Sequence, residues 1–325
     1  MERFKNILCY LGNDDTDTAI EKAIELSEAN RARLTVMDVI RPMPRSMQLL
    51  TDTASPDDLD RLVLDDHQDK LHDRLREYRD TGVEIQTVVR TGDAATEIVR
   101  EVLDGNYDLV IKTADGFSVG ERLFGSVSLS VLRSCPCPVW ALKPDLYGAF
   151  DRIVVALDLD SHDEQHCELN RQLLDLSYSL VDDEQTQLHL VSAWEFWMEG
   201  PLRKRAGDAE VNQLIKQREA KMQQRLDDLL PSAMSSDRRV RAHLQRGTAT
   251  SSILAMAASI EADLVVMGTV SRSGLKGFLI GNTAESVISE LRCSLLALKP
   301  PGFVSPMEND ESEWKGESTG SLPFV

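Results

Sequence analysis

Short apolar runs and longer amphipathic stretches alternate along the first half of the chain. Five runs rich in Val, Ile and Leu predict strands at residues 7–11, 34–40, 83–89, 109–113 and 139–143. Between them, apolar positions three and four residues apart predict helices at 16–29, 57–78 and 94–103, and one that starts at residue 126. Continuous apolar strands are typical of parallel sheets covered on both faces. This half therefore predicts a doubly wound α/β domain with a five-stranded parallel sheet and helices on both faces.

The second half of the chain repeats this order of elements. Residues 4–14 line up with residues 150–160 at an offset of 146, which is 150 minus 4. Further along, Gly92 matches Gly247 and Gly125 matches Gly281, at offsets of 155 and 156. A repeat of this length is a whole domain, so we expect one domain at residues 1–144 and a second at 150–300.

The segments outside the two copies are short and polar. Residues 145–149 form a short linker that limits the distance between the two domains, so we expect the domains to pack against each other. In the second copy we expect strands at 153–158, 188–193, 240–245 and 264–267 and a last one within 295–300, with helices at 164–180, 209–230 and 250–260. Residues 301–325 have no apolar periodicity and predict a disordered acidic tail.

A glycine-punctuated loop follows the strand at 264–267. Gly268, Gly274, Gly277 and Gly281 free its backbone, and Asn282 or Thr283 is predicted to cap the helix that follows. Backbone N–H groups at a helix N-terminus attract phosphate, and open parallel sheets bind ligands at the carboxyl ends of their strands. The spacing is neither the GxGxxG of dinucleotide folds nor the GxxxxGK[ST] of P-loops.

This loop resembles the signature of the universal stress protein family, G-x2-G-x9-G followed by a small polar residue. Gly268 fills the first position, Ser271 stands at the second glycine, and Gly281 with Asn282 closes the motif. The length and the repeat are similar to the family's tandem, two-domain members. The resemblance implies a cytoplasmic stress-response protein that holds ATP or another adenine nucleotide, with Mg²⁺, in its second domain. It implies nucleotide contacts at Asp158, Gly268, Thr269, Ser271, Arg272, Gly281, Asn282 and Thr283.

Two of these positions also have a simpler interpretation. Asp158 ends the first strand of the second copy, where the family uses an aspartate towards adenine and ribose, but a solvated aspartate at a strand end would look the same. Arg272 and Lys276 either clamp a polyphosphate or are solvated. In the first copy Gly12 replaces the aspartate and Asp115 adds negative charge to the loop, so we expect that site to be degenerate.

Composition and charge narrow the class of function. A net charge of −18 without a basic stripe argues against nucleic acid as a partner. No apolar run approaches the ~20 residues of a membrane helix, and the N-terminal residues lack a signal-peptide pattern. The five cysteines form no disulfide framework and indicate a reducing cytoplasm. The sequence is compatible with a homodimer but contains no feature that requires one.

Other candidate sites have weaker patterns. His162 and His166 are spaced to bind zinc on one helical face, but a polar first turn of a surface helix explains them better, because no further Cys/His cluster is nearby in sequence. No nucleophile, base and orienting group can be assembled, so we do not expect an enzyme, although a slow nucleotide hydrolase is a third alternative.

Two apolar loops suggest another function. They follow the second strand of each copy, and each would form either a covered domain interface or a chamber for an amphipathic ligand. The alternative function is therefore a scaffold that binds no nucleotide and takes an amphipathic ligand or a protein partner through these loops. Their apolar residues are Met43, Met47, Leu49 and Leu50 in the first copy and Trp194, Phe196, Trp197 and Met198 in the second.

Overall fold

The computed structural model describes residues 3–12, 16–42, 56–114, 124–144, 150–161, 163–181, 184–270 and 280–308. The chain divides into two compact units. The first unit is built mainly from Met1–Tyr147, and the second from Gly148–Gly274 and Ile280–Gly302. Each unit is described by itself below.

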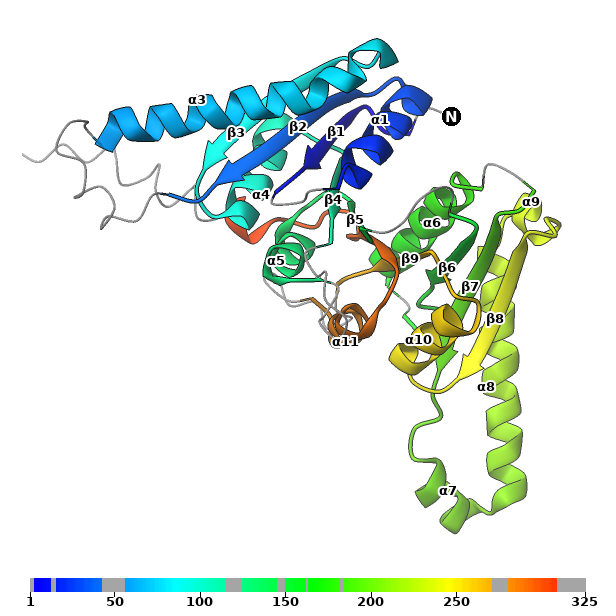
Figure 1. The fold of residues 1–325 in the computed structure, drawn as a ribbon. Coiled ribbons are helices and arrows are strands. Elements are labelled where there is room, and N and C mark those ends of the chain that lie inside the picture. The colour runs from blue at the N-terminus through cyan, green and yellow to red at the C-terminus, as the bar shows by residue number, and fades with distance from the viewer. Residues whose placement is uncertain are drawn as a thin grey trace, which may run out of the picture. The chain divides into compact units, whose positions relative to one another are not determined.

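The first unit contains a parallel five-stranded sheet. Its strands lie in the order β3-β2-β1-β4-β5, and helices connect them (Figure 1). The strands are β1 (Asn6–Tyr10), β2 (Arg33–Ile40), β3 (Ile85–Thr91), β4 (Leu109–Thr113) and β5 (Val139–Leu142). The helices are α1 (Thr18–Asn30), α3 (Pro56–Arg74), α4 (Ala94–Gly105) and α5 (Ser126–Ser134), and a 3₁₀ segment (Leu75–Thr81) follows α3.

The second unit has the same topology. Its parallel strands lie in the order β8-β7-β6-β9-β10, so the strand order reverses between β6 and β9 (Figure 1). The strands are β6 (Arg152–Ala156), β7 (Gln187–Trp194), β8 (Val240–Arg246), β9 (Leu264–Gly268) and β10 (Ser294–Leu298). The helices are α6 (Glu164–Tyr178), α7 (Glu199–Ala206), α8 (Asp208–Leu229), α9 (Ser232–Ser235), α10 (Ala249–Ser259) and α11 (Asn282–Glu290). The predicted fold class is confirmed in both units.

The core of each unit lies along its central strands. Every residue of β1, β4 and β10 is buried, as expected for strands covered on both faces. Full burial of a Val, Leu or Ile side chain contributes about 1.5–3 kcal/mol, so these strands supply much of the stability. Some of the helices that follow strand ends start at side-chain caps. Asp93, Asp163 and Thr248 accept backbone N–H bonds at the starts of α4, α6 and α10.

The structure differs from the predicted elements in three places. The helix expected at 57–78 ends at Arg74 and continues as the 3₁₀ segment, which tightens its last turns before Gly82. The helix expected at 209–230 is preceded by α7, which buries no residue and so leaves no apolar period in the sequence. The described chain also continues past Pro300 to Glu308 and buries Ser305, so disorder from residue 301 is wrong for this stretch.

Candidate functional site

The second unit contains a cavity of about 390 Å³ at the carboxyl ends of β6 and β9. This is the point where the strand order reverses, and open α/β sheets bind ligands there. The walls come from strand ends and from the starts of α6, α10 and α11. They include Ala156, Asp158, Asp160, His166, Leu169, Asn170, Trp194, Glu195, Thr248, Ile253, Met267, Gly268, Gly281, Asn282, Thr283 and Ala284.

Asp158 is held in place by a buried asparagine of α6. The Asn170 side-chain amide donates to the Asp158 carbonyl over 2.8 Å, and its oxygen accepts the Asp158 N–H over 3.1 Å. The Asp158 carboxylate in turn accepts the backbone N–H groups of Asp160 and Ser161. These bonds fix the turn after β6, so the carboxylate at the cavity wall is preorganised.

Two arginines of helix α8 bind the same turn. The Arg218 guanidinium pairs with the Asp160 carboxylate, and Arg225 donates to the carbonyl of Leu159 over 2.7 Å. The position of the turn therefore depends on a helix that is far from it in sequence.

The start of α11 forms the opposite wall. The helix begins at Asn282 with Gly281 as its N-cap, and no side chain caps it. The prediction that Asn282 or Thr283 is the cap is therefore wrong, because both lie in the first turn. First-turn N–H groups have no partner inside a helix and carry partial positive charge. This wall thus offers donors to an anion.

Thr269 lies beside the cavity but does not line it. Its side chain is fully buried and accepts a 2.8 Å bond from the Lys299 ammonium. Its carbonyl accepts the Gly281 N–H over 2.9 Å, and Val270 bridges Ile280. Thr269 thus joins the two ends of the glycine-rich loop.

The remaining predicted contacts divide into two groups. Asp158, Gly268, Gly281, Asn282 and Thr283 all lie in the cavity wall. Ser271 and Arg272 lie outside the described residues, as do Lys276, Gly274 and Gly277.

Gly268 also has a packing role. A Cβ at this position would come within 2.6 Å of the Leu169 side chain, so α6 packs closely onto the end of β9. Asn170 was not predicted as a site residue, because a polar position on a mainly apolar helix face does not by itself indicate a site. Ser177 is a second polar position on the same buried face.

The charged groups in the described part of the wall are mainly acidic. They are the carboxylates of Asp158, Asp160 and Glu195, and the His166 imidazole lies in the same wall. The His166 ring and backbone and the Ser161 hydroxyl all bond to Asp163, and these bonds hold the pKa of the Asp163 carboxyl well below its usual range. Asp163 therefore stays ionised and orients His166 at the cavity edge.

The spacing of His162 and His166 is not tested by the structure, because His162 lies outside the described residues. Helix α6 begins at Glu164 and carries His166 in its first turn. Within the described ranges, no group of three or more His, Cys, Asp or Glu side chains could hold a metal ion.

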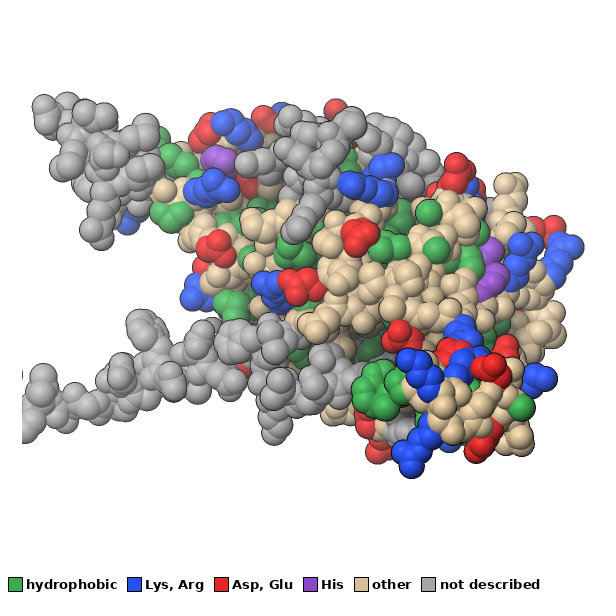
Figure 2. Space-filling view, turned by 90° about the horizontal axis from the view of Figure 1, so that it is seen from below, with side chains coloured by type: hydrophobic (Ala, Val, Ile, Leu, Met, Phe, Trp, Pro, Cys, Tyr) green, Lys and Arg blue, Asp and Glu red, His purple; other side chains and the backbone are tan. Residues whose placement is uncertain are grey.

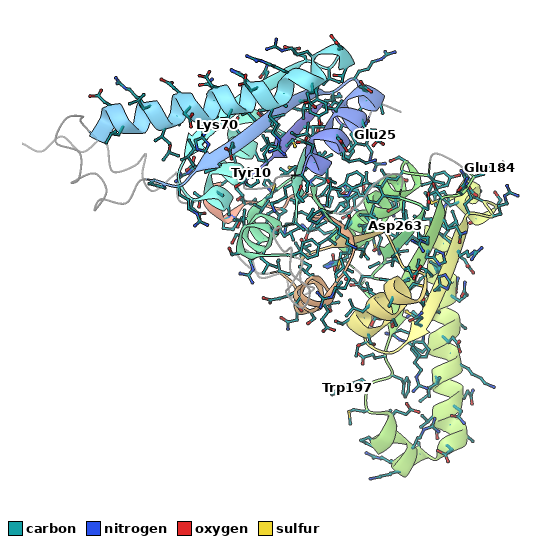
Figure 3. All side chains as sticks on the ribbon, viewed as in Figure 1. Tyr10, Glu25, Lys70, Glu184, Trp197 and Asp263 are labelled. Carbon is teal, nitrogen blue, oxygen red and sulfur yellow. The ribbon has the colours of Figure 1, made fainter. Side chains whose placement is uncertain are left out.

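The second apolar loop divides between the cavity and the surface. Trp194 is buried in the cavity wall, and the Arg246 guanidinium lies 5.8 Å from its ring centroid. Trp197 is 83% exposed and points away from the unit (Figure 3), and Met198 is 48% exposed. Of this loop, Trp194 thus lies at the cavity, whereas Trp197 and Met198 lie at the surface of the unit. The first apolar loop lies outside the described residues.

Surface charge and hydropathy fit the composition. On the face shown in Figure 2, basic and acidic side chains are interspersed rather than gathered in a basic stripe. In the part of the chain that the structure describes, no helix is long and apolar enough to cross a membrane.

Comparison with known proteins agrees with both the repeat and the fold. The model of the universal stress protein family matches residues 3–143 and again residues 149–299. Universal stress protein E of Salmonella typhi is 29% identical over 321 residues, which cover 96% of this chain and 100% of that protein. Universal stress protein E of Photorhabdus laumondii is 27% identical over 315 residues, with coverage of 95% and 99%.

Two solved structures share the fold over most of the chain. A functionally unknown protein from Pseudomonas aeruginosa PAO1 aligns with a TM-score of 0.73 at 23% identity, covering 96% of this chain and 98% of that one. A universal stress protein from Archaeoglobus fulgidus aligns with a TM-score of 0.59 at 20% identity, with coverage of 90% and 98%. Because the family model matches both units, this chain belongs to the universal stress protein family as a tandem, two-domain member.

Proposed function

We propose that the second unit binds an adenine nucleotide in the cavity between β6 and β9, and that the protein acts in the cytoplasm as a stress-response binding protein rather than by turnover. The observation that carries the proposal is the cavity itself. It gathers Asp158, Gly268, Gly281 and the first turn of α11, which the family resemblance had assigned to the nucleotide. Its volume of about 390 Å³ falls in the range of small-molecule sites.

The distribution of charge supports one orientation of the nucleotide. Carboxylates accept hydrogen bonds from hydroxyl groups, so the wall with Asp158 and Asp160 suits a ribose. The uncapped start of α11 suits phosphate. Arg272 and Lys276 of the glycine-rich loop are the proposed cationic contacts for the phosphates.

We expect this binding to depend on Mg²⁺. Asp160 is paired with Arg218, but the Asp158 and Glu195 carboxylates lie in the same cavity and repel a triphosphate, and Mg²⁺ on the phosphates offsets part of that repulsion. We therefore expect ATP to bind more tightly with Mg²⁺ than with a chelator, and adenosine to show no such difference.

A calorimetric titration with Mg-ATP tests the proposal, with two glycine variants as a matched pair. Gly281 and Gly125 are both N-caps with extended backbone, of α11 and α5 respectively, so valine should cost each helix a similar amount. Of the two, Gly281 lines the cavity. Gly281→Val should weaken binding by more than about tenfold, and Gly125→Val by less than about twofold.

The titration uses protein that has been unfolded and refolded to remove any ligand that co-purifies. Equal losses in the two variants, or no heat of binding in the wild type, would contradict the proposal.

Trp194 supports a second candidate. Its ring shares the cavity wall with Leu169, Leu173 and Ile253, a surface that suits the apolar part of an amphipathic ligand. Each buried CH₂ contributes about 0.8 kcal/mol, so the affinity of a fatty-acid series, read from tryptophan fluorescence, should rise with chain length. A flat response would remove this candidate and leave nucleotide binding unaffected.

A further inference from the structure

The two units differ most clearly at the strand ends that would form a ligand site. In the second unit, Ala156 at the end of β6 and Met267 of β9 line the cavity together with Ala284 of α11. The repeat places Tyr10, Lys112 and Ser128 at the matching positions of the first unit. Tyr10 and Lys112 are direct neighbours in the β1–β4 register, and all three side chains are buried.

Tyr10 occupies the space of the missing aspartate. Gly12 matches Asp158, and a Cβ built at Gly12 would lie 2.9 Å from Cε1 and 3.0 Å from the hydroxyl of the Tyr10 ring. Gly12 also has a φ of +60°, which glycine adopts at low cost. A side chain at position 12 therefore cannot be added without moving the ring of Tyr10, which is labelled in Figure 3. The second unit carries the opposite pair, a small Ala156 and an acidic Asp158.

Lys112 supplies a buried cation at the same end of the sheet. Its side chain is 1% exposed, and its ammonium donates to the Ser128 hydroxyl over 2.7 Å and to the Thr113 carbonyl over 2.6 Å. Ser128 lies in the first turn of α5, the helix that corresponds to α11. A charge buried this deeply is costly unless it is hydrogen-bonded, so these bonds hold Lys112 firmly in place.

We infer that the first unit is closed to nucleotide by its own side chains, Tyr10 over Gly12 and Lys112 on Ser128, so that each chain binds one nucleotide. The inference rests on the proposed function of the second unit. Four pairs of matching positions then decide which copy binds nucleotide. They are 10 and 156, 12 and 158, 112 and 267, and 128 and 284, with the first of each pair in the first unit.

Exchanging these residues between the units tests the inference. The opened variant carries Tyr10→Ala, Gly12→Asp, Lys112→Met and Ser128→Ala; the closed variant carries Ala156→Tyr and Asp158→Gly. In calorimetry with Mg-ATP we expect one site per chain in the wild type, a second and weaker site in the opened variant, and none in the closed variant.

Several outcomes separate the inference from the proposed function. Two binding sites in the wild type, or one site that remains in the Gly281→Val variant, would show that the first unit also binds nucleotide. Either result would leave nucleotide binding standing and overturn the inference. A wild type with no site would overturn both. An opened variant that keeps the wild-type circular dichroism spectrum and binds only one nucleotide would also overturn the inference.

A double-mutant cycle of melting temperatures tests the steric contact between Tyr10 and position 12 without any ligand. Gly12→Asp alone should lower the melting temperature, because its side chain meets the Tyr10 ring and because a φ of +60° favours glycine. In the Tyr10→Ala background the same change should lower it less, because only the backbone strain remains. Equal losses in both backgrounds would show that Tyr10 does not occupy the aspartate position, and would overturn the inference.

Discussion

A buried histidine that stacks on a half-buried one should make the second unit sensitive to mild acid. His189 of β7 is 4% exposed, and its Nδ1 lies 3.1 Å from Nε2 of His243 on β8, with the two rings parallel and their centroids 5.1 Å apart. Burial, followed by the nearby His243 and Arg241, lowers the pKa of His189 from 6.5 to about 4. Burial and Arg241 also lower the pKa of His243.

The sign of the effect follows from linkage. A histidine whose pKa is lower in the folded state binds fewer protons there than in the unfolded chain between pH 4 and 6.5. The stability is therefore complete above pH 6.5 and falls as the pH drops towards 4. Between pH 8 and pH 5, His189 alone should account for a loss of about 2 kcal/mol in the free energy of unfolding.

Urea unfolding at pH 5, 6, 7 and 8, followed by far-ultraviolet circular dichroism, measures this loss. The control is the double variant His189→Gln/His243→Gln, which retains every carboxylate of the protein and removes only the two imidazoles. The wild type should lose at least about 2 kcal/mol more than the control between pH 8 and 5, because His243 adds to the contribution of His189. Parallel pH profiles for the two proteins would refute the reasoning, because the loss would then come from groups other than this pair.

Three further predictions test the boundaries of the fold and of the site. Truncation after Glu308 should leave the melting temperature unchanged in a thermal scan, whereas truncation after Pro300 should lower it by roughly 3 °C, because it removes the buried Ser305. Trp197→Ala should leave the same scan unchanged, since this side chain is 83% exposed. Asn170→Ala should cost about 1–3 kcal/mol in urea unfolding and weaken Mg-ATP binding in calorimetry, because it releases the turn that carries Asp158; an unchanged affinity would show that the turn does not need this anchor.

The strands were predictable because their physics is local. A run such as residues 264–267 is apolar at every position, and only a strand covered on both faces buries such a run. The repeat then fixed the order of the elements, because two copies of the same pattern must share a fold. Helix α7 was not predictable in this way. It buries no side chain and so has no apolar period; its Glu199 pairs with Arg203 inside the helix and with Arg246 of β8 outside it.

The candidate site was predictable only in part. The motif identified Gly268, Gly281 and the start of α11, since these positions are set by the loop between two strands. The motif did not predict that the Thr269 side chain points into the core and bonds to Lys299. The direction of one side chain at a strand end depends on the strands beside it. The motif also did not identify Asn170, whose role appears only when α6 is packed against the turn after β6.

The comparison of the two units separates the residues that make the fold from those that make the site. The copies share capped helices after the third strand, at Asp93 and Thr248, and fully buried last strands. They differ where the first and fourth strands end, in pairs such as Gly12 and Asp158. Strand ends lie at the rim of the core, so an exchange of a small residue for a large one there can be balanced by its neighbour, as Gly12 balances Tyr10. Duplication of this fold therefore allows one copy to lose its ligand site while both copies keep their stability.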